Sequence, residues 1–430
     1  MAFFAIAILG SVLSALIPPL QSPDEPEHIN RAYLLAHMSE TYNVPGHSTG
    51  GEIDSGLSRY EMLFAGKLTA KPDARYTARL AREAAAIRWS GEHVFSDMAG
   101  SAPYLPLDYV PQAIGLRIGE ALDLSVGASY RVARVAALFT IALIIAVAFA
   151  IWPPNALLIC VLALPMTMFQ IASASSDGLS FAWLVLAASL FMLGSDRSAS
   201  FRAWHPVLLM LAVFMVVTAR PQMLPVLALP ASVFFMRKEW RWLAAWAVVA
   251  GAAFMWLNTA AHIVDLRMPR SVTTGQATAL YLWHPLGFAA VLARTLSSEI
   301  NLIFYWRSFI GILGWLDRPM PSYVYSICGV GLALAAALSV ARISIKHRVL
   351  LIGCAAVAIL LTFFAMLITW TDQPAKFIVG VQGRYFIAPA VLLAYSFGPP
   401  RGVWWMIICG AFVVFTTAMT VSTLLWTYYL

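Results

Sequence analysis

Charged residues are scarce in this chain of 430 residues. Lysine, arginine, aspartate and glutamate together make up 11% of it, whereas 60% of the residues are apolar. A soluble domain carries about 25% charged residues, so the composition excludes one. The mean hydropathy of +0.76 indicates a polytopic membrane protein. The net charge of +7 does not indicate nucleic-acid binding, because membrane proteins sort basic residues by side of the membrane.

Cysteine is also rare. The four cysteines, Cys160, Cys328, Cys354 and Cys409, all fall in apolar segments and show no metal-ligand spacing. They favour small core residues over a disulfide framework. The first apolar run, residues 2–17, lacks a basic start and a clear cleavage site. It is therefore interpreted as a retained span rather than a signal peptide.

Apolar segments that suit a membrane helix, roughly 17–25 residues, recur along the chain. We expect one all-α integral membrane domain over residues 1–430, with a bundle of about eleven to thirteen transmembrane helices. The upper count includes segment 285–316, whose apolar run is interrupted by charged residues. The other predicted spans are residues 2–17, 131–152, 155–173, 179–194, 205–219, 222–236, 240–258, 322–341, 349–369, 385–398 and 402–427.

The short loops between these spans indicate how the chain is oriented. Alternation from a cytoplasmic N-terminus puts loops 195–204, 237–239, 342–348 and 399–401 on one side, with few acids among them. The positive-inside rule predicts that this side is cytoplasmic. The basic residues are Arg197, Arg202, Arg237, Lys238, Arg342, Lys346, Arg348 and Arg401, together with Arg241 at the start of the span that follows loop 237–239.

The same alternation places residues 18–130 outside, before a transmembrane bundle over residues 131–430. This first loop has nine basic and fourteen acidic residues, a net charge of −5. Its middle has the apolar spacing of helices, which predicts surface helices along the membrane. The loop is too long to serve only as a connection.

Polar residues gather at the predicted extracytoplasmic ends of the spans. No ionisable residue stands at the middle of a clear span. The pattern therefore predicts a site at one membrane surface. The clusters are SPDEPEH (residues 22–28), SASSDG (173–178), TARPQ (218–222) and TDQPAKFIVGVQGRYF (371–386).

The first cluster holds the vicinal acids Asp24 and Glu25. Acids favour the start of a helix, so a structural role is open for both. The alternative is that one acid stays ionised as a base while the other orients it or holds a metal. His28 is expected to be a hydrogen-bonding partner rather than a metal ligand, because no second histidine is spaced to join it.

The second and third clusters add Asp177 and Arg220. Asp177 has the position of a helix cap, and this interpretation is favoured over a functional one. Arg220 follows an apolar run and precedes a proline. It could reach toward lipid headgroups or bind a phosphate.

The fourth cluster holds Arg384 within GVQGRYF, where two glycines allow close backbone approach. A guanidinium matches phosphate oxygens in a bidentate geometry, so Arg384 is the stronger candidate for phosphate binding. Lys376 is a second nearby cation. Gln382 and Tyr385, from the same motif, complete the predicted substrate-binding residues.

The layout resembles the GT-C superfamily of integral membrane glycosyltransferases. The shared features are a first span, an acidic pair just outside it, a long external loop, YLPLDYVPQAIG before the second span, and many short spans. More narrowly, SPDEPEHINRAYLLAH, SSDGLSFAWLVLAASL, GILGWLD and GVQGRYFIAPAVLL are similar to a bacterial family of predicted membrane proteins of unknown function. This resemblance extends over nearly the full chain.

The superfamily resemblance implies transfer of a sugar from a polyprenyl-phosphate carrier to a lipid, glycan or protein hydroxyl, usually with inversion. It implies a multi-pass protein of the bacterial inner membrane, with an extracytoplasmic active site and a role in cell-envelope polysaccharide biosynthesis. It also implies an Asp/Glu base in the first external loop, which corresponds to Asp24 and Glu25. The expected partners are the lipid-linked donor, the acceptor and membrane lipids, with no nucleic acid.

The resemblance leaves a divalent metal ion, Mg²⁺ or Mn²⁺, open as a cofactor, because some members of the superfamily use one and others do not. No residue is assigned as a metal ligand. Phosphate binding by Arg220 and Arg384 is a physical inference, since a phosphate leaving group develops charge that a cation stabilises.

Two other functions stay open on the sequence. A transporter or flippase of lipid-linked glycans would show repeats and binding groups near the middle of the membrane, whereas here no repeat is visible and the charges gather at one face. A non-catalytic scaffold of an envelope-polysaccharide complex would have no cavity beside Asp24.

Overall fold

The computed structural model describes residues 2–71, 73–339, 344–400 and 402–430. Within these ranges the chain is mostly helical, and the predicted all-α class is confirmed. Two small antiparallel pairs are the strands among the described residues. Arg342 and Arg401, which contribute to the predicted orientation, lie outside the described residues.

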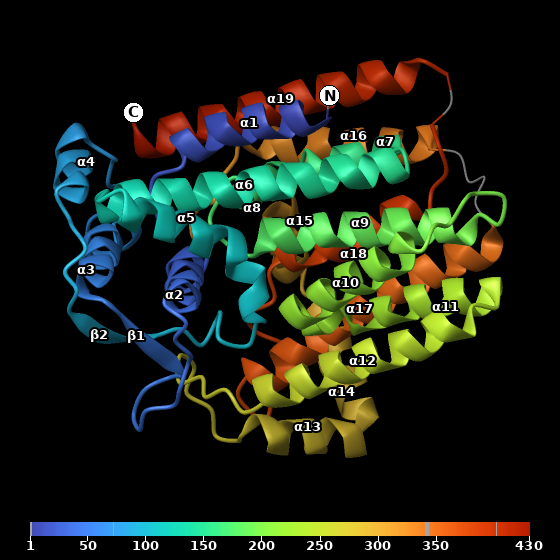
Figure 1. Cartoon of the computed structure of the whole chain (residues 1–430), viewed down its shortest axis with the longest axis horizontal. Coiled ribbons are helices and arrows are strands. Elements are labelled where there is room, and N and C mark those ends of the chain that lie inside the picture. The colour runs from blue at the N-terminus through green and yellow to red at the C-terminus, as the bar shows by residue number, and fades with distance from the viewer. Residues whose placement is uncertain (1, 72, 340–343, 401) are drawn as a thin grey trace.

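The segment that the sequence predicts to be external is a folded layer at one end of the molecule, on the left of Figure 1, and we call it the external layer. After helix α1 (Ala2–Leu16), short helices alternate with the pair β1–β2, whose register joins Gly50 to Asp97 and Asp54 to His93. Large side chains such as Tyr60 and Phe64 are fully buried beneath it. Its elements are α2 (Glu25–Ala36), β1 (Gly50–Asp54), α3 (Ser55–Phe64), the π-helix η1 (Ala65–Thr69), α4 (Ala78–Ala85), β2 (His93–Asp97), the 3₁₀ helix η2 (Pro106–Tyr109) and α5 (Val110–Ala121).

Five helices among the described residues are long and apolar enough to cross a membrane. They are α6 (Val126–Ile151), α9 (Asp177–Ser195), α12 (Trp240–Ala260), α17 (Ile345–Thr369) and α19 (Trp404–Tyr428). The pair α14 (Pro285–Ser297) and α15 (Glu299–Ile310), bent by 76°, makes a sixth candidate. Shorter apolar helices are α1, α10 (Trp204–Ala219) and α16 (Ser322–Leu338).

The predicted number of spans, eleven to thirteen, therefore exceeds the number of described helices that are long enough to cross a membrane. Three predicted spans are each divided into two short helices. In the predicted span 155–173 the second piece begins at Pro165, because a proline lacks the N–H that would continue a helix. The short helices are α7 (Ala156–Leu162), α8 (Pro165–Ile171), η3 (Pro221–Leu227), α11 (Ala228–Arg237), η4 (Gly383–Phe386) and α18 (Ile387–Tyr395). Helix α13 (Thr274–Trp283) and the pair β3 (Ile312–Leu313) and β4 (Arg318–Pro319) complete the described elements.

Helix α9 lies at the centre of the bundle. Of the 18-residue apolar stretch of α9, 83% is buried, compared with 11% of the corresponding stretch of α12. Helix α9 packs against α6, α10 and α18. Burial on all sides explains why α9 has no polar stripe. Its first residue, Asp177, consequently starts inside the molecule, beneath the external layer.

The basic loops meet at the opposite end of the bundle. Arg237 donates from Nε to the carbonyl of Gly194 at 2.6 Å and from Nη2 to that of Asp196 at 2.6 Å. The start of α17 reaches the same place, where His347 Nε2 lies 3.3 Å from Met236 Sδ. The structure thus gathers these loops at one end, as predicted, and which membrane face this end occupies stays a prediction.

Other helix ends meet the external layer. The amide of Tyr76 donates to the carbonyl of Tyr428 at the end of α19, at 2.7 Å. Trp256, near the end of α12, donates from Nε1 to the carbonyl of Pro103 at 3.1 Å. The layer is therefore tied to the bundle by the ends of helices far apart in sequence.

Candidate functional site

The turn before α2 directs Asp24 away from its own helix. Asp24 has φ 60° and ψ 5°, the left-handed region that few residues other than glycine adopt. Although Asp24 occupies the N-cap position, its side chain makes no hydrogen bond to the start of α2. The structural interpretation of Asp24 as a helix cap is therefore not supported, and the side chain is directed to Arg384 instead.

Arg384, in η4, is held by several acceptors at once. Its Nη2 donates to Asp24 Oδ2 at 2.6 Å, and its Nη1 donates to Asp177 Oδ2 at 3.2 Å. Its Nε donates to Gln382 Oε1 at 2.6 Å, and its guanidinium lies 5.2 Å from the ring centre of Tyr385. These contacts fix a buried cation between two carboxylates.

Gly383 of GVQGRYF is required by close backbone contacts. A Cβ at Gly383 would collide with the carbonyl oxygen of Tyr305 and the amide nitrogen of Phe309, both in α15. The amide of Gly383 donates to Ser308 Oγ at 2.8 Å. Only a glycine lets η4 pack this tightly on α15, and this packing positions Arg384.

Asp177 joins a second arginine to the group. Its carboxylate accepts hydrogen bonds from Arg220 Nη2, Gln170 Nε2 and Arg384 Nη1. Arg220 ends α10 and lies 5.3 Å from the ring centre of Phe181. It is therefore directed inward to Asp177 and not to lipid headgroups, and the N-cap of α9 is Ser176 rather than Asp177. We call Asp24, Asp177, Arg220 and Arg384 the charge cluster.

Asp24 is the accessible member of the charge cluster. Its side chain is 33% exposed, whereas those of Arg384, Arg220 and Asp177 are 4%, 7% and 9% exposed. Burial raises the pKa of Asp24, but the charge of Arg384 and its hydrogen bond together outweigh that effect and hold the pKa below its ordinary value. Asp24 is thus an ionised carboxylate that a ligand can approach.

His28 lies one turn after Asp24 on α2. Its Nδ1 is 2.8 Å from the hydroxyl of Tyr109 in a hydrogen bond, and its ring stacks on that of Tyr104 with centres 5.9 Å apart. His28 thus forms a hydrogen bond, as expected. Burial lowers the pKa of His28, although Asp177 and Asp24 oppose this effect, so the imidazole beside the cluster is neutral.

Glu25 lies outside the charge cluster, although it follows Asp24 in sequence. Arg134 of α6 donates to it from Nε and Nη2, both at 3.0 Å, and Tyr130 donates to its Oε1 at 2.8 Å. The amide of Ala174 donates to the same oxygen at 2.7 Å. This fully buried carboxylate joins α2 to α6 and to the segment before α9.

Lys376 also lies apart. It is exposed, its ammonium is 5.7 Å from the ring centre of Phe377, and its carbonyl accepts from Arg294 Nε at 3.2 Å. The structure therefore brings together most of the predicted site residues and leaves out Lys376 and Glu25. Those brought together are Asp24, His28, Asp177, Arg220, Gln382, Arg384 and Tyr385.

Several residues of this region were not predicted from sequence. Tyr104, Asp108 and Tyr109 come from YLPLDY, and Gln170 from the end of α8. The one available signal was the position of Asp108, an acid among apolar and proline residues just before a helix. Nothing in the sequence pairs these residues with α2 or α9.

The charge cluster does not fit a divalent metal. Its two carboxylates already accept hydrogen bonds from arginines, and a cation between them would face two guanidinium groups. Within the described ranges, no group of three or more His, Cys, Asp or Glu residues is placed to hold a metal ion. The metal requirement stays open.

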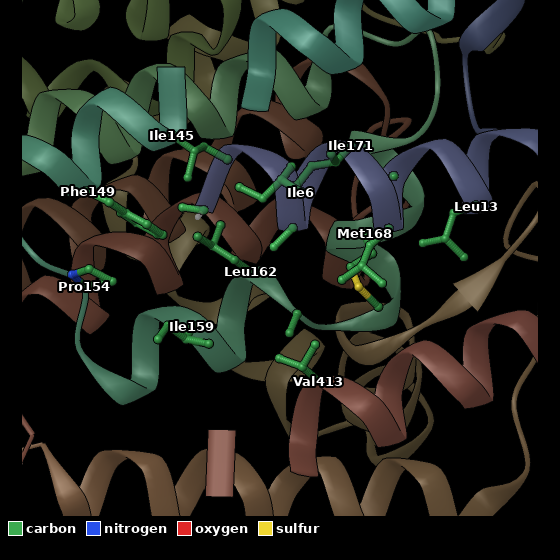
Figure 2. Close-up of a pocket in the computed structure, with 15 residues that line it drawn as sticks. Ile6, Leu13, Ile145, Phe149, Pro154, Ile159, Leu162, Met168, Ile171 and Val413 are labelled. Atoms are coloured by element: carbon green, nitrogen blue, oxygen red, sulfur yellow. The ribbon is translucent and has the colours of Figure 1, made fainter. Parts of the chain in front are cut away.

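A separate apolar cavity of about 330 Å³ lies among α1, α6, α7, α8 and α19. Figure 2 shows the side chains that line it, among them Ile6 and Leu13 of α1, Phe149 of α6 and Val413 of α19. All of its lining residues are apolar or glycine, and none belongs to the charge cluster.

The fold and the charge cluster define a polytopic helical membrane protein with paired buried charges at one end of its bundle. Residues 7–393 match the model of the family described as predicted membrane protein, DUF2142. The chain belongs to this family, which confirms the narrower of the two resemblances.

No curated protein matches the chain. Among solved structures, the chain is similar to ArnT from Cupriavidus metallidurans in the apo state, with 15% identity and a TM-score of 0.34 over 97% of this chain and 76% of that one. It is also similar to the same protein bound to undecaprenyl phosphate, with 13% identity and a TM-score of 0.32 over 97% and 77%. These TM-scores are too low for the likeness to carry an argument.

Proposed function

We propose that this protein is a glycosyltransferase that moves a sugar from a polyprenyl-phosphate carrier to a hydroxyl of a lipid, glycan or protein acceptor. The reaction would take place at the extracytoplasmic face of the bacterial inner membrane. The observation that carries the proposal is the pairing of an accessible carboxylate, Asp24, with a buried guanidinium, Arg384, at 2.6 Å. One group suits a base and the other suits a phosphate.

The reaction is a single displacement. Asp24 takes the proton of the acceptor hydroxyl, and the acceptor oxygen forms a bond to the anomeric carbon. The bond between that carbon and the phosphate oxygen breaks, and its electron pair leaves with the polyprenyl phosphate. Arg384, with Arg220 behind it, stabilises the charge on the leaving phosphate. A single displacement inverts the anomeric centre.

The Asp24–Arg384 pair couples donor binding to base strength. A phosphate that binds Arg384 competes with Asp24 for the guanidinium. Because Arg384 holds the pKa of Asp24 down, losing part of this contact raises that pKa. Asp24 becomes a better proton acceptor when the donor is in place.

Glu25 has a different role in this proposal. The sequence suggested that it assists or orients Asp24, but its carboxylate already accepts from Arg134, Tyr130 and Ala174. We assign Glu25 to holding α2 against α6. The position of Asp24 depends on this anchor, so Glu25 supports the base without contacting the reactants.

The proposal is tested with the purified protein in liposomes that contain undecaprenyl phosphate carrying a hexose, an N-acetylhexosamine or a pentose, together with a lipid extract as acceptor. We expect acceptor-dependent release of undecaprenyl phosphate from at least one donor. If the labelled donor crosses the bilayer intact and is not cleaved, the protein is a flippase. If neither cleavage nor movement occurs with any donor, the scaffold interpretation is correct.

A further inference from the structure

Asp108 is a buried acid without a hydrogen-bond partner. It lies in η2, its side chain is fully enclosed, and neither carboxylate oxygen accepts a hydrogen bond from a described residue. Burial raises the pKa of Asp108 well above its ordinary value, and only the charge of Arg220 opposes this effect. Buried polar groups are nearly always paired, so an acid left in this state indicates a missing partner.

Three neighbouring side chains also have one unfilled position each. Gln112, one turn after Asp108, donates from Nε2 to the carbonyl of Ala174 at 3.2 Å, but its Oε1 accepts nothing. Gln170 donates to Asp177 while its Oε1 accepts nothing, and Arg220 Nε donates to nothing. Both glutamines are thus tied to the segment that contains Asp177, the partner of Arg220.

The unfilled positions share a chemical character. They comprise the two oxygens of Asp108 and one oxygen each of Gln112 and Gln170, against a single donor, Arg220 Nε. A ligand that satisfies them must bring several donors and at least one acceptor on a compact frame. Hydroxyl groups on adjacent carbons of a sugar do so, because each hydroxyl both donates and accepts.

The place of these groups fits the transferred part of the donor. The charge of Arg220 acts on Asp108, Arg220 donates to Asp177, and Asp177 contacts Arg384, the proposed phosphate ligand. Tyr104, four residues before Asp108, stacks on His28, and aromatic faces pack against the apolar face of a ring. The unfilled groups therefore lie beside Arg220, which Asp177 links to the proposed phosphate ligand Arg384.

We propose that Asp108, Gln112, Gln170 and Arg220 form the subsite that binds the hydroxyl groups of the transferred sugar, an inference that rests on the proposed function. Asp108 is fully enclosed here, and η2 packs on α2 and α10. Sugar binding therefore includes a shift of η2 away from these helices. Asp108 is the specificity-determining residue, because both oxygens of its carboxyl group are unpaired and can form hydrogen bonds with neighbouring hydroxyls.

The test compares two lipids that differ only in the sugar. Affinities for undecaprenyl phosphate and for its glycosylated forms are measured with the wild type, Asp108→Ala and Asp108→Asn in nanodiscs. Asp73→Ala, an exposed aspartate of the same external segment, is the matched control. Thermal unfolding of each variant establishes that it is folded. If Asp108→Ala does not fold, Asp108→Asn, which keeps the side-chain volume, replaces it in the comparison.

We expect the wild type and the control to bind one glycosylated lipid more tightly than undecaprenyl phosphate. Asp108→Ala loses this preference by about tenfold or more, while its affinity for undecaprenyl phosphate is unchanged. Three results would overturn the inference. They are a preference unchanged in Asp108→Ala, an equal loss of affinity for both lipids, and a wild type with no preference for any sugar, which would mean that ordered water fills the unpaired groups.

The binding measurement separates this inference from the proposed function. If the preference depends on Asp108 but the wild type cleaves no donor, the subsite exists and the transferase proposal fails. If the wild type transfers sugar and Asp108→Ala keeps the preference, the transferase proposal holds and the subsite is wrong.

Discussion

Arg384 Nη2 lies 2.6 Å from Asp24 Oδ2, although 360 positions separate the two residues in the sequence. The contact joins the turn before α2 to η4, and Asp177 at the start of α9 binds the same guanidinium. Motifs from the external layer and from the last third of the chain thus meet at one place.

Replacing the guanidinium is expected to change the pH dependence of transfer. In Arg384→Gln the burial of Asp24 remains, whereas the charge that lowers its pKa is lost, so the pKa of Asp24 rises. Protonated Asp24 cannot act as a base, so the acidic limb of the kcat/KM profile moves to higher pH by about one unit or more. An exposed control, Arg82→Gln, keeps the wild-type profile. An acidic limb that stays in place in Arg384→Gln would show that Asp24 is not the titrating base.

Glu25→Gln is expected to reduce stability. The change leaves Arg134 buried without its carboxylate, and breaking a buried ion pair costs about 3–5 kcal/mol. Thermal unfolding in detergent measures the loss. The double variant Glu25→Gln, Arg134→Met should recover part of it, because no unpaired charge remains. A Glu25→Gln protein that unfolds like the wild type but transfers no sugar would restore Glu25 as a catalytic residue.

Gly383→Ala is expected to displace the phosphate ligand. The added methyl group would lie against the backbone of Tyr305 and Phe309, so η4 must move away from α15. Because a misplacement of about 1 Å at a reacting group costs on the order of 10²-fold in rate, transfer should fall strongly. Gly410→Ala is the control, since its Cβ meets nothing within 4 Å. Equal transfer rates in the two variants would contradict the role of η4.

Glu27 gives the stability of the protein a pH dependence of known sign. Burial raises the pKa of Glu27 from 4.5 to about 7. The charge of Arg267, 3.2 Å away, opposes this effect, whereas the charges of Asp24 and Asp265 add to it. The folded state therefore favours protonated Glu27. This contribution is fully present below the ordinary pKa and is lost as pH rises through about 7.

Glu27→Gln should remove this loss, because its side chain stays neutral. Between about pH 5 and about pH 8 the wild type is expected to lose about 1–3 kcal/mol more stability than Glu27→Gln. Thermal unfolding of both proteins across this range measures the difference. Parallel curves would contradict the raised pKa.

The fold class and the main site residues were predictable because they depend on composition and on motifs. The role of Glu25 was not predictable, because the left-handed backbone of Asp24 directs its side chain to Arg384, whereas Glu25, the first residue of α2, faces Arg134. Asp24 and Glu25 therefore face different partners, and the sequence does not say which faces Arg384. The same limit applies to Asp108, because Arg220, whose charge acts on it, is distant in sequence and approaches it only through the packing of η2 on α10.

The described helices of spanning length are fewer than the predicted spans for a related reason. Apolar content predicts burial, but Pro165 begins a new short helix inside the predicted span 155–173. The direction of the chain after each break depends on packing against α9 and α17, which composition does not encode.

The most direct test of the account is transfer by Asp24→Asn in liposomes, with binding of undecaprenyl phosphate measured on the same preparation. The account predicts that transfer falls by about 10²–10⁴-fold. Undecaprenyl phosphate should bind at least as tightly as to the wild type, because Arg384 no longer pairs with a carboxylate. Transfer by Asp24→Asn at the wild-type rate would contradict the assignment of Asp24 as the base.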